Sequence, residues 1–503
     1  MDATVTSQPE ASESPAIKPL RFSLDEAGLA ALAASPLLAP APSPARPRRV
    51  QDRFFDTENF ALAHHGITLY LRKAGRGASM VLLHEGEMLR AMLPTQAPDL
   101  AAFGPDWQAA LTGILKDAPL GEVASASLRQ TIRKLGSAEL AFETGHLTAH
   151  GQKLAFSELQ ISAPAATLPE TALALAARFT LRLQPLPPGP RAVRLAGGPP
   201  QAVQKAAPGL QGEPCLDEAV QHVISACLDQ FRANWAVFYE GDEVGAVHQM
   251  RVALRRLRSA LGLFNRALPT PEFRTLREEA KRIAGTMGEA RNWDVFIAML
   301  HDGPAAAFPN EVGFVALEAQ CTAHRQAGYK LVRELLEDPA TTRFLLMAEG
   351  FIAKRGWRGG LPTEALPRLA QPARSFGAEC LERLHRKVRK RGRHLGGLPA
   401  HDRHMVRIEL KKLRYAAEFF GNLFAPRGRV RHFNRAAAAL QEELGKLNDM
   451  ATAEGLAIRL QGGTPEALRA LGIVLGWTAH AALGDPRALN AAWKDFQDAR
   501  LFT

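Results

Sequence analysis

Histidine, arginine and lysine residues occur twice in this sequence at the same helical spacing. The first copy begins at His248 and the second at His404, 156 residues later. Each histidine is followed by basic residues at +3, +7, +8 and +10 and by apolar residues at +4 and +9. Agreement at so many offsets indicates two related helical segments within one chain. The basic residues of the two copies are Arg251, Arg255, Arg256 and Arg258, and Arg407, Lys411, Lys412 and Arg414.

Spacings of three and four residues place side chains on one face of an α-helix. Each histidine and its basic residues at +3, +7 and +10 therefore form a basic stripe, which runs beside an apolar stripe. No Asp or Glu lies three or four residues from Arg251 or Arg255, so an external anion would relieve the repulsion between these cations. A solvated helix face is the alternative interpretation of one such stripe. Its repetition with a histidine at the same place favours phosphate binding.

Further basic residues lie close to both copies. Arg383, Lys387 and Lys390 are spaced by four and three residues on a segment before the second copy. After each copy comes a segment that ends in aspartate, at Asp294 and Asp449. We expect these aspartates to anchor cations of neighbouring helices, with a chemical role as the alternative. The remaining candidate phosphate contacts are Lys281, Arg282 and Arg291.

The charge distribution favours a polyanionic partner. The net charge is +11, with 42 Lys and Arg against 33 Asp and Glu in residues 206–503 but 20 against 18 in residues 1–205. Residues 354–414 alone contain 17 basic and 5 acidic side chains. Such a concentration raises the local positive potential. The basic segments contain few aromatic residues besides Tyr415, which disfavours single-stranded nucleic acid as the ligand.

The residue composition and periodicity of the sequence change near a stretch rich in Pro and Gly at 184–200. From Asp217 onward, long segments of Ala, Leu, Arg and Glu with a helical period predict an all-helical domain. Before it, short runs such as 67–71 and 80–83 are rich in β-branched and large apolar residues, which predicts an α+β domain with an antiparallel sheet. We therefore expect a multidomain chain, α+β followed by all-α.

The repeated motifs resemble those of the CHAD domain, the conserved-histidine α-helical family. HxxRVxxRRLR is followed by Gly-x-x-Arg-Asn-x-Asp, and HxxRIxxKKLRY is followed by Leu-Gly-x-Leu-Asn-Asp. The resemblance covers residues 213–503. It implies two four-helix bundles related by pseudo-two-fold symmetry, with both stripes lining a groove that binds inorganic polyphosphate. It also implies an association with prokaryotic polyphosphate granules and their proteins.

Residues 16–195 resemble a degenerate CYTH (triphosphate tunnel) domain, an antiparallel β-barrel that processes triphosphates with a divalent metal. The resemblance rests on the segment Phe54-Phe55-Asp56-Thr57 and the strand that follows it. The family's opening Glu-x-Glu-x-Lys strand appears as 17–21, which keeps only the cation Arg21, and its closing Glu-x-Glu appears as Glu158-Leu-Gln160. Arg72, Arg129 and Arg133 could still contact an anion. A lone carboxylate holds Mg²⁺ poorly, so we predict no metal site and a non-catalytic scaffold; the alternative is a metal-dependent triphosphatase or polyphosphatase.

We expect four segments: a disordered tail at 1–15, the CYTH-like domain at 16–195, a linker at 196–212 and the helical domain at 213–503. The four cysteines are scattered without metal-ligand spacing, which is typical of a reducing compartment. The chain has no secretory signal pattern and no apolar stretch of membrane-spanning length. We expect a cytoplasmic, non-enzymatic polyphosphate-binding protein without catalytic residues or cofactors, located on polyphosphate granules.

Overall fold

The computed structural model describes residues 17–38, 47–75, 77–84, 87–95, 97–460, 462–483 and 486–503. The chain forms two compact units. The first contains residues 1–201 together with 345–354, and the second contains residues 202–344 and 355–503. The predicted disordered tail, residues 1–15, lies outside the described residues.

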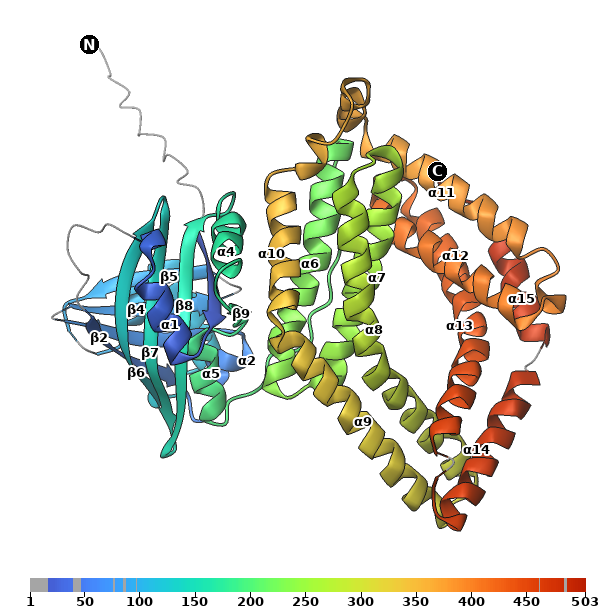
Figure 1. The fold of residues 1–503 in the computed structure, drawn as a ribbon, viewed down its shortest axis with the longest axis horizontal. Coiled ribbons are helices and arrows are strands. Elements are labelled where there is room, and N and C mark those ends of the chain that lie inside the picture. Colours follow the sequence, from blue (N-terminus) through green and yellow to red (C-terminus); the bar gives the residue numbers. More distant parts are fainter. Residues whose placement is uncertain are drawn as a thin grey trace. The chain divides into compact units, whose positions relative to one another are not determined.

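The first unit is built on one antiparallel sheet (Figure 1). Its strand order is β5-β4-β3-β2-β6-β7-β8-β1-β9. The strands are β1 (Ile17–Ser23), β2 (Arg48–Asp56), β3 (Thr68–Ala74), β4 (Gly77–His84), β5 (Glu87–Leu93), β6 (Gly121–Leu135), β7 (Ala138–Ala149), β8 (Gln152–Pro164) and β9 (Arg182–Leu183). The prediction of an α+β domain with an antiparallel sheet is confirmed.

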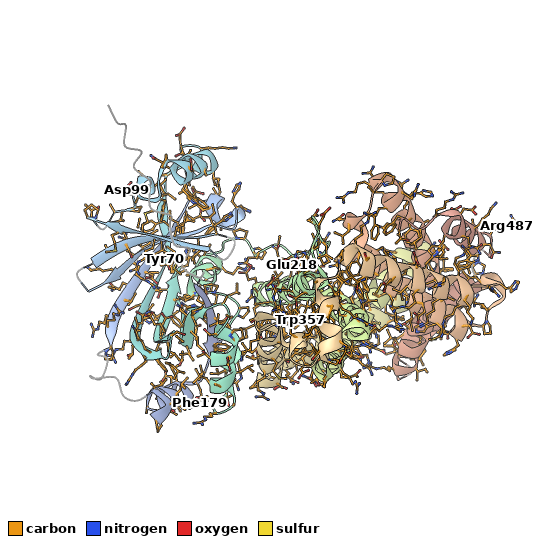
Figure 2. The ribbon with its side chains drawn as sticks, turned by 90° about the horizontal axis from the view of Figure 1, so that it is seen from above. Tyr70, Asp99, Phe179, Glu218, Trp357 and Arg487 are labelled. Carbon is orange, nitrogen blue, oxygen red and sulfur yellow. The ribbon has the colours of Figure 1, made fainter. Side chains whose placement is uncertain are left out.

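Five helices pack with this sheet: α1 (Glu26–Ala33), α2 (Ala61–His64), α3 (Pro105–Leu115), α4 (Leu168–Ala176) and α5 (Pro188–Leu195). Helix α5 lies within the stretch that is rich in Pro and Gly, where the fixed φ of proline suits a first helical turn. Its Ala192 and Val193 join an apolar cluster with Phe54 and Tyr70 of the strands. Gly189 allows the close approach, because a Cβ there would lie 2.8 Å from a methyl of Thr68. Figure 2 labels Tyr70 among the strands.

The second unit is helical, as predicted. Its helices are α6 (Leu216–Glu240), α7 (Glu243–Ala267), α8 (Pro271–Leu300), α9 (Gly313–Glu337), α10 (Pro339–Ala353), α11 (Ala373–Arg391), α12 (Ala400–Phe420), α13 (Arg427–Ala457), α14 (Pro465–Leu483) and α15 (Pro486–Asp498). Residues 345–354, which include most of α10, group with the first unit. No described helix combines the length and the apolar character that crossing a bilayer requires.

The two sequence repeats fall on α7 and α12, which pack against each other (Figure 1). Phe264 of α7 and Phe420 of α12 meet around Phe376 of α11, with ring centroids 5.8 to 6.4 Å apart. Helix α7 packs on α6 and α8, and α12 packs on α11 and α13. A separate apolar cluster around Trp293 and Leu456 joins α8 and α9 to α13 and α14. We call α6 to α9 the first half of this unit and α11 to α14 the second half. The two halves contact each other through α7 and α12 and through the cluster around Trp293.

A buried carboxylate fixes the start of α6. Asp217 accepts hydrogen bonds from Trp357 Nε1 at 2.8 Å and from Arg358 Nε at 3.1 Å, and it is also paired with Arg355. Trp357, labelled in Figure 2, is fully buried. Because an unpaired buried carboxylate is costly, these donors hold the segment after α10 against α6.

Candidate anion-binding site

The first basic stripe runs along α7. The helix begins at its N-cap Asp242, whose side chain accepts a hydrogen bond from the amide of Gly245. Leu254, Leu257 and Leu261 are buried on one face. The stripe residues beside them, His248, Arg251, Arg255 and Arg258, are all half-buried.

Arg251 is held against the neighbouring helix α8. Its Nη1 donates a hydrogen bond to the carbonyl oxygen of Ala284 at 2.5 Å. A Cβ at Gly288 would lie 2.7 Å from the same nitrogen, so the absence of a side chain there makes room for the guanidinium. Burial, and then the positive charges of Arg255 and Arg291, lower the pKa of Arg251 to about 10. The causes of this shift include no carboxylate that would compensate the charge of the Arg251 guanidinium.

His248 shares this electropositive environment. Burial lowers the pKa of its imidazole below the usual value, and the cations Arg291, Arg255, Arg251 and Lys205 lower it further. This lowered pKa favours the neutral imidazole in the free protein. An anion placed among these cations would favour the protonated imidazole.

Farther along the stripe, Arg258 repeats the pattern. Burial and the charge of Arg277 on α8 lower its pKa, and Glu278 opposes the shift. Arg251 and Arg255 form no ion pair with any carboxylate among the described residues. The Nε atoms of Arg251, Arg255 and Arg258 are buried and have no hydrogen-bond partner in the described part of the chain.

The second basic stripe lies on α12. Its Arg407, Lys411 and Arg414 are half-buried, and His404 is exposed. A Cβ at Gly445 of α13 would lie 3.9 Å from Nη2 of Arg407. Arg407 thus lies beside a glycine of the next helix, as Arg251 lies beside Gly288.

Three of the predicted phosphate contacts are engaged elsewhere in the fold. Arg256 follows Arg255 by one residue and therefore projects about 100° around α7 from it. Its Nε donates to Glu418 of α12 at 3.1 Å, and its Nη1 donates to Gln230 of α6 at 2.8 Å. Sequence spacing cannot show these partners, because they come from other helices. Arg256 holds α7 to α12.

Lys412 and Lys387 share one buried carboxylate. Glu409 of α12 lies 3.0 Å from the Nζ of Lys412 and 2.9 Å from the Nζ of Lys387 on α11. Burial opposes ionisation of Glu409, but the two lysines outweigh it and lower its pKa. By helical periodicity Glu409 projects on the side of α12 opposite the stripe. The structure therefore places Lys387 away from the stripe residues of α12.

The other predicted contacts lie on α8 and α11. Lys281 and Arg282 of α8 pair with Glu278 and Glu279 of the preceding turn, at 3.6 and 3.0 Å. Arg383 donates to the sulfur of Cys380 at 3.7 Å, whereas Lys390 is exposed. Arg291 is the member of this group that the structure brings to the first stripe.

The aspartate after the first copy is an anchor, as expected. Asp294 accepts hydrogen bonds from Arg325 at 2.9 Å and from Tyr329 at 2.8 Å, both on α9, and it lies 3.8 Å from Arg291. The corresponding expectation for Asp449 falls outside the described side chains.

The sheet unit contains a second set of charged groups, and these neutralise one another. Glu143 and Glu158 lie directly opposite each other on β7 and β8, and Arg21 of β1 bridges them at 2.7 and 3.3 Å. Burial opposes ionisation of Glu143, but Arg21 outweighs it and lowers the pKa of this carboxyl. Arg191 of α5 also pairs with Glu158. The prediction of Glu158 as a lone carboxylate was therefore wrong.

Arg72 is likewise paired inside the sheet unit, with Asp52 at 2.6 Å. Asp52, Glu143 and Arg191 are not predicted from the sequence motifs, because none of them belongs to one. Asp52 and Glu143 are buried charged residues on β2 and β7, whereas Arg191 lies on α5. Among the described residues, no three His, Cys, Asp or Glu side chains are grouped to hold a metal ion.

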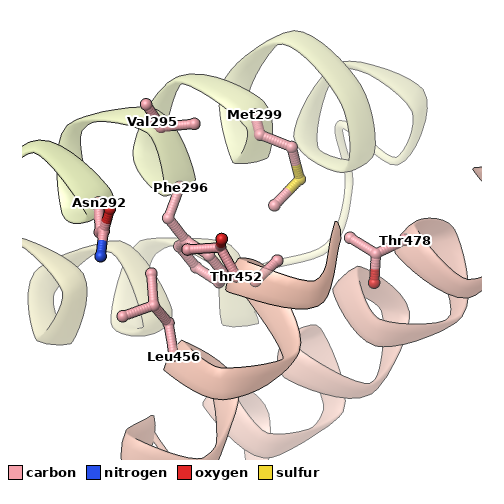
Figure 3. Close-up of a pocket in the computed structure, with 8 residues that line it drawn as sticks. Asn292, Val295, Phe296, Met299, Thr452, Leu456 and Thr478 are labelled. Atoms are coloured by element: carbon pink, nitrogen blue, oxygen red, sulfur yellow. The ribbon is translucent and has the colours of Figure 1, made fainter. Parts of the chain in front are cut away.

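A pocket between α8, α13 and α14 lies apart from these charges (Figure 3). It is lined mainly by apolar side chains such as Val295, Phe296, Met299 and Leu456, with Asn292 and two threonines. A lining without charged groups does not suit a phosphate polymer.

Comparison with known proteins agrees with the helical fold and the repeated motifs. The family model of the CHAD domain matches residues 222–457. The crystal structure of the CHAD domain from the plant Ricinus communis is 30% identical, covers 60% of this chain and 98% of its own, and has a TM-score of 0.51. The chain belongs to the CHAD domain family.

Two further structures match the N-terminal region. A candidate adenylate cyclase from Bacillus halodurans is 12% identical, covers 32% of this chain and 92% of its own, and has a TM-score of 0.25. An adenylyl cyclase candidate from Hippeastrum, described as having a dominant triphosphatase activity, is 14% identical, covers 32% and 84%, and has a TM-score of 0.21. No curated protein sequence matches the chain.

Proposed function

We propose that the helical unit binds inorganic polyphosphate without hydrolysing it. The main support is the first stripe, where half-buried arginines on α7 lie together without carboxylate partners among the described residues. Uncompensated cations of this kind favour an external polyanion. Arginine forks match phosphate oxygens, and a phosphate polymer has no bases that require stacking aromatic side chains.

The proposal includes the finer architecture that the sequence motifs imply. The two repeat-containing halves would be related four-helix bundles, and the stripes of α7 and α12 would line one groove. The paired glycines, Gly288 beside Arg251 and Gly445 beside Arg407, support this relation. Location on polyphosphate granules in the cytoplasm, with granule proteins as partners, is part of the same proposal.

A charge-reversal variant tests the proposal. Arg255→Glu with Lys411→Glu places two negative charges in the stripes, and we expect retention of long-chain polyphosphate in a filter or gel assay to fall by at least about tenfold. Lys494→Glu with Arg500→Glu changes the net charge equally at exposed positions outside the stripes and should retain binding. Undiminished binding by the stripe variant, with helicity intact, would overturn the proposal.

Selectivity is tested by competition. If DNA or RNA displaces long-chain polyphosphate at equal phosphate concentration and salt, the ligand class is wrong.

The alternative function, a metal-dependent triphosphatase or polyphosphatase in the sheet unit, would appear as phosphate release that requires Mg²⁺ or Mn²⁺.

A further inference from the structure

The segment before α6, residues 202–212, is fixed to the helical unit although it contains no helix or strand. The side chain of Asn234 on α6, which is fully buried, both accepts a hydrogen bond from the amide of Gln204 at 3.0 Å and donates one to its carbonyl oxygen at 2.8 Å. Farther along, the amide of Leu210 donates to the carbonyl oxygen of Phe419 on α12 at 2.9 Å. Residues 204 and 210 are therefore attached to different halves of the unit.

This attachment brings the segment to the beginning of the first stripe. A Cβ at Gly245 would lie 2.7 Å from a methyl carbon of Val203, so the segment contacts α7 at Gly245. His248 follows Gly245 by three residues and lies one turn farther along the same face. Lys205, two residues after Val203, is exposed, and its charge acts on His248.

Two cations near His248, Lys205 and Arg291, are not part of the repeated motif. In the sequence, the segments that follow the stripes align at Gly288 and Gly445, and Asn448 is then aligned with Arg291. The segment 202–212 occurs once in the chain and precedes the first half alone. The cation at Arg291 is therefore not repeated at the aligned position of the second half.

We propose that Lys205, His248, Arg251, Arg255 and Arg291 form a discrete anion site that binds a short phosphate chain without the second stripe. This site rests on the proposed function and specifies where its strongest contact lies. Three separate elements, the segment 202–212, α7 and α8, supply its cations. A tripolyphosphate anion provides several oxygens for the guanidinium groups and for the ammonium of Lys205.

Calorimetric titration of the full chain with tripolyphosphate tests this site. Lys205→Gln should weaken binding by about fivefold, since it removes one charged contact at an exposed position, whereas Lys205→Arg should restore it. Lys494→Gln on α15 makes the same charge change at an exposed position and should bind as the unmodified chain does. Lys411→Gln, in the second stripe, should leave tripolyphosphate affinity within about twofold and weaken long-chain polyphosphate.

The outcomes separate the two proposals. If Lys205→Gln binds tripolyphosphate as tightly as Lys494→Gln does, the discrete site is overturned even when long-chain polyphosphate is retained. If Lys411→Gln weakens tripolyphosphate as much as Lys205→Gln does, the anion spans both stripes and the discrete site is again overturned. Failure of the unmodified chain to retain long-chain polyphosphate would overturn the proposed function itself.

Discussion

At the scale of single residues, neighbouring charges decide which basic side chains can meet a ligand. Arg255 and Arg256 are adjacent in sequence and identical in type, yet they face different partners. Arg256 donates to Glu418 and Gln230, whereas Arg255 has no ion pair among the described residues. The number of cations in a motif therefore overstates the number available to an anion.

The environment of His248 predicts a pH dependence of binding. Its pKa is lowered by burial and by Arg291, Arg255 and Arg251 on two helices and Lys205 on the preceding segment. A bound polyanion offsets these cations and favours imidazolium, so binding takes up a proton. We expect affinity for long-chain polyphosphate to rise about three- to tenfold between pH 7.5 and pH 5.5.

Binding assays at both pH values measure this effect, and long chains minimise the contribution of titrating terminal phosphates. His248→Gln should lose most of the gain. The effect of pH on the stability of the free protein is opposite to its effect on binding. Because the pKa of His248 is lowered in the folded protein, the unfolded chain takes up a proton more readily, and the free energy of unfolding falls as the pH decreases below about 6.5. Equal gains for the unmodified chain and His248→Gln would contradict the assignment.

At the scale of elements, the contact between α7 and α12 joins the two repeats. The aromatic rings of Phe264, Phe376 and Phe420 supply its apolar part. The Arg256 side chain is 13% exposed and that of Glu418 is 35% exposed, so this ion pair is only partly screened by water. The pair thus contributes to holding the repeats together.

Removing this pair should destabilise the helical unit. We expect Arg256→Gln to lower the free energy of unfolding by about 1–3 kcal/mol, since it leaves the Glu418 carboxylate without its charged donor. Urea denaturation monitored by circular dichroism measures the change. Lys446→Gln removes an exposed pair with Glu443 and should cost less than about 0.5 kcal/mol. Similar losses for the two variants would show that the contact between α7 and α12 does not depend on Arg256.

At the scale of the whole molecule, the two units differ in whether their buried and half-buried arginines are paired with carboxylates. In the sheet unit, Arg21, Arg72 and Arg191 are matched by Asp52, Glu143 and Glu158. In the helical unit, arginines of the first stripe lack such partners among the described residues. A triphosphate entering the sheet unit would have to displace internal carboxylates, whereas an anion at the helical unit would relieve repulsion.

We therefore expect no triphosphatase activity from the sheet unit. The full chain, incubated with tripolyphosphate and Mg²⁺ or Mn²⁺, should release no phosphate above a protein-free control in a colorimetric assay. Metal-dependent release that disappears in Glu158→Ala would instead establish the enzymatic alternative.

The features that depend on local periodicity were predictable from the order of the residues alone. The spacing of basic and apolar residues predicted helices at the positions of α7 and α12. The change in residue composition and periodicity predicted a sheet domain before a helical one. These patterns are readable because a helix face is fixed by residues three and four apart. The repeated motif also identified the family.

Which charges are compensated depends on how distant elements pack together. The partners of Arg256, Lys387 and Arg21 come from other helices or strands, many residues away in the chain. The attachment of Gln204 to Asn234, which brings Lys205 to the first stripe, likewise has no local signature. Coulombic and hydrogen-bonding energies depend on distance in space, and that distance is set by how the elements pack.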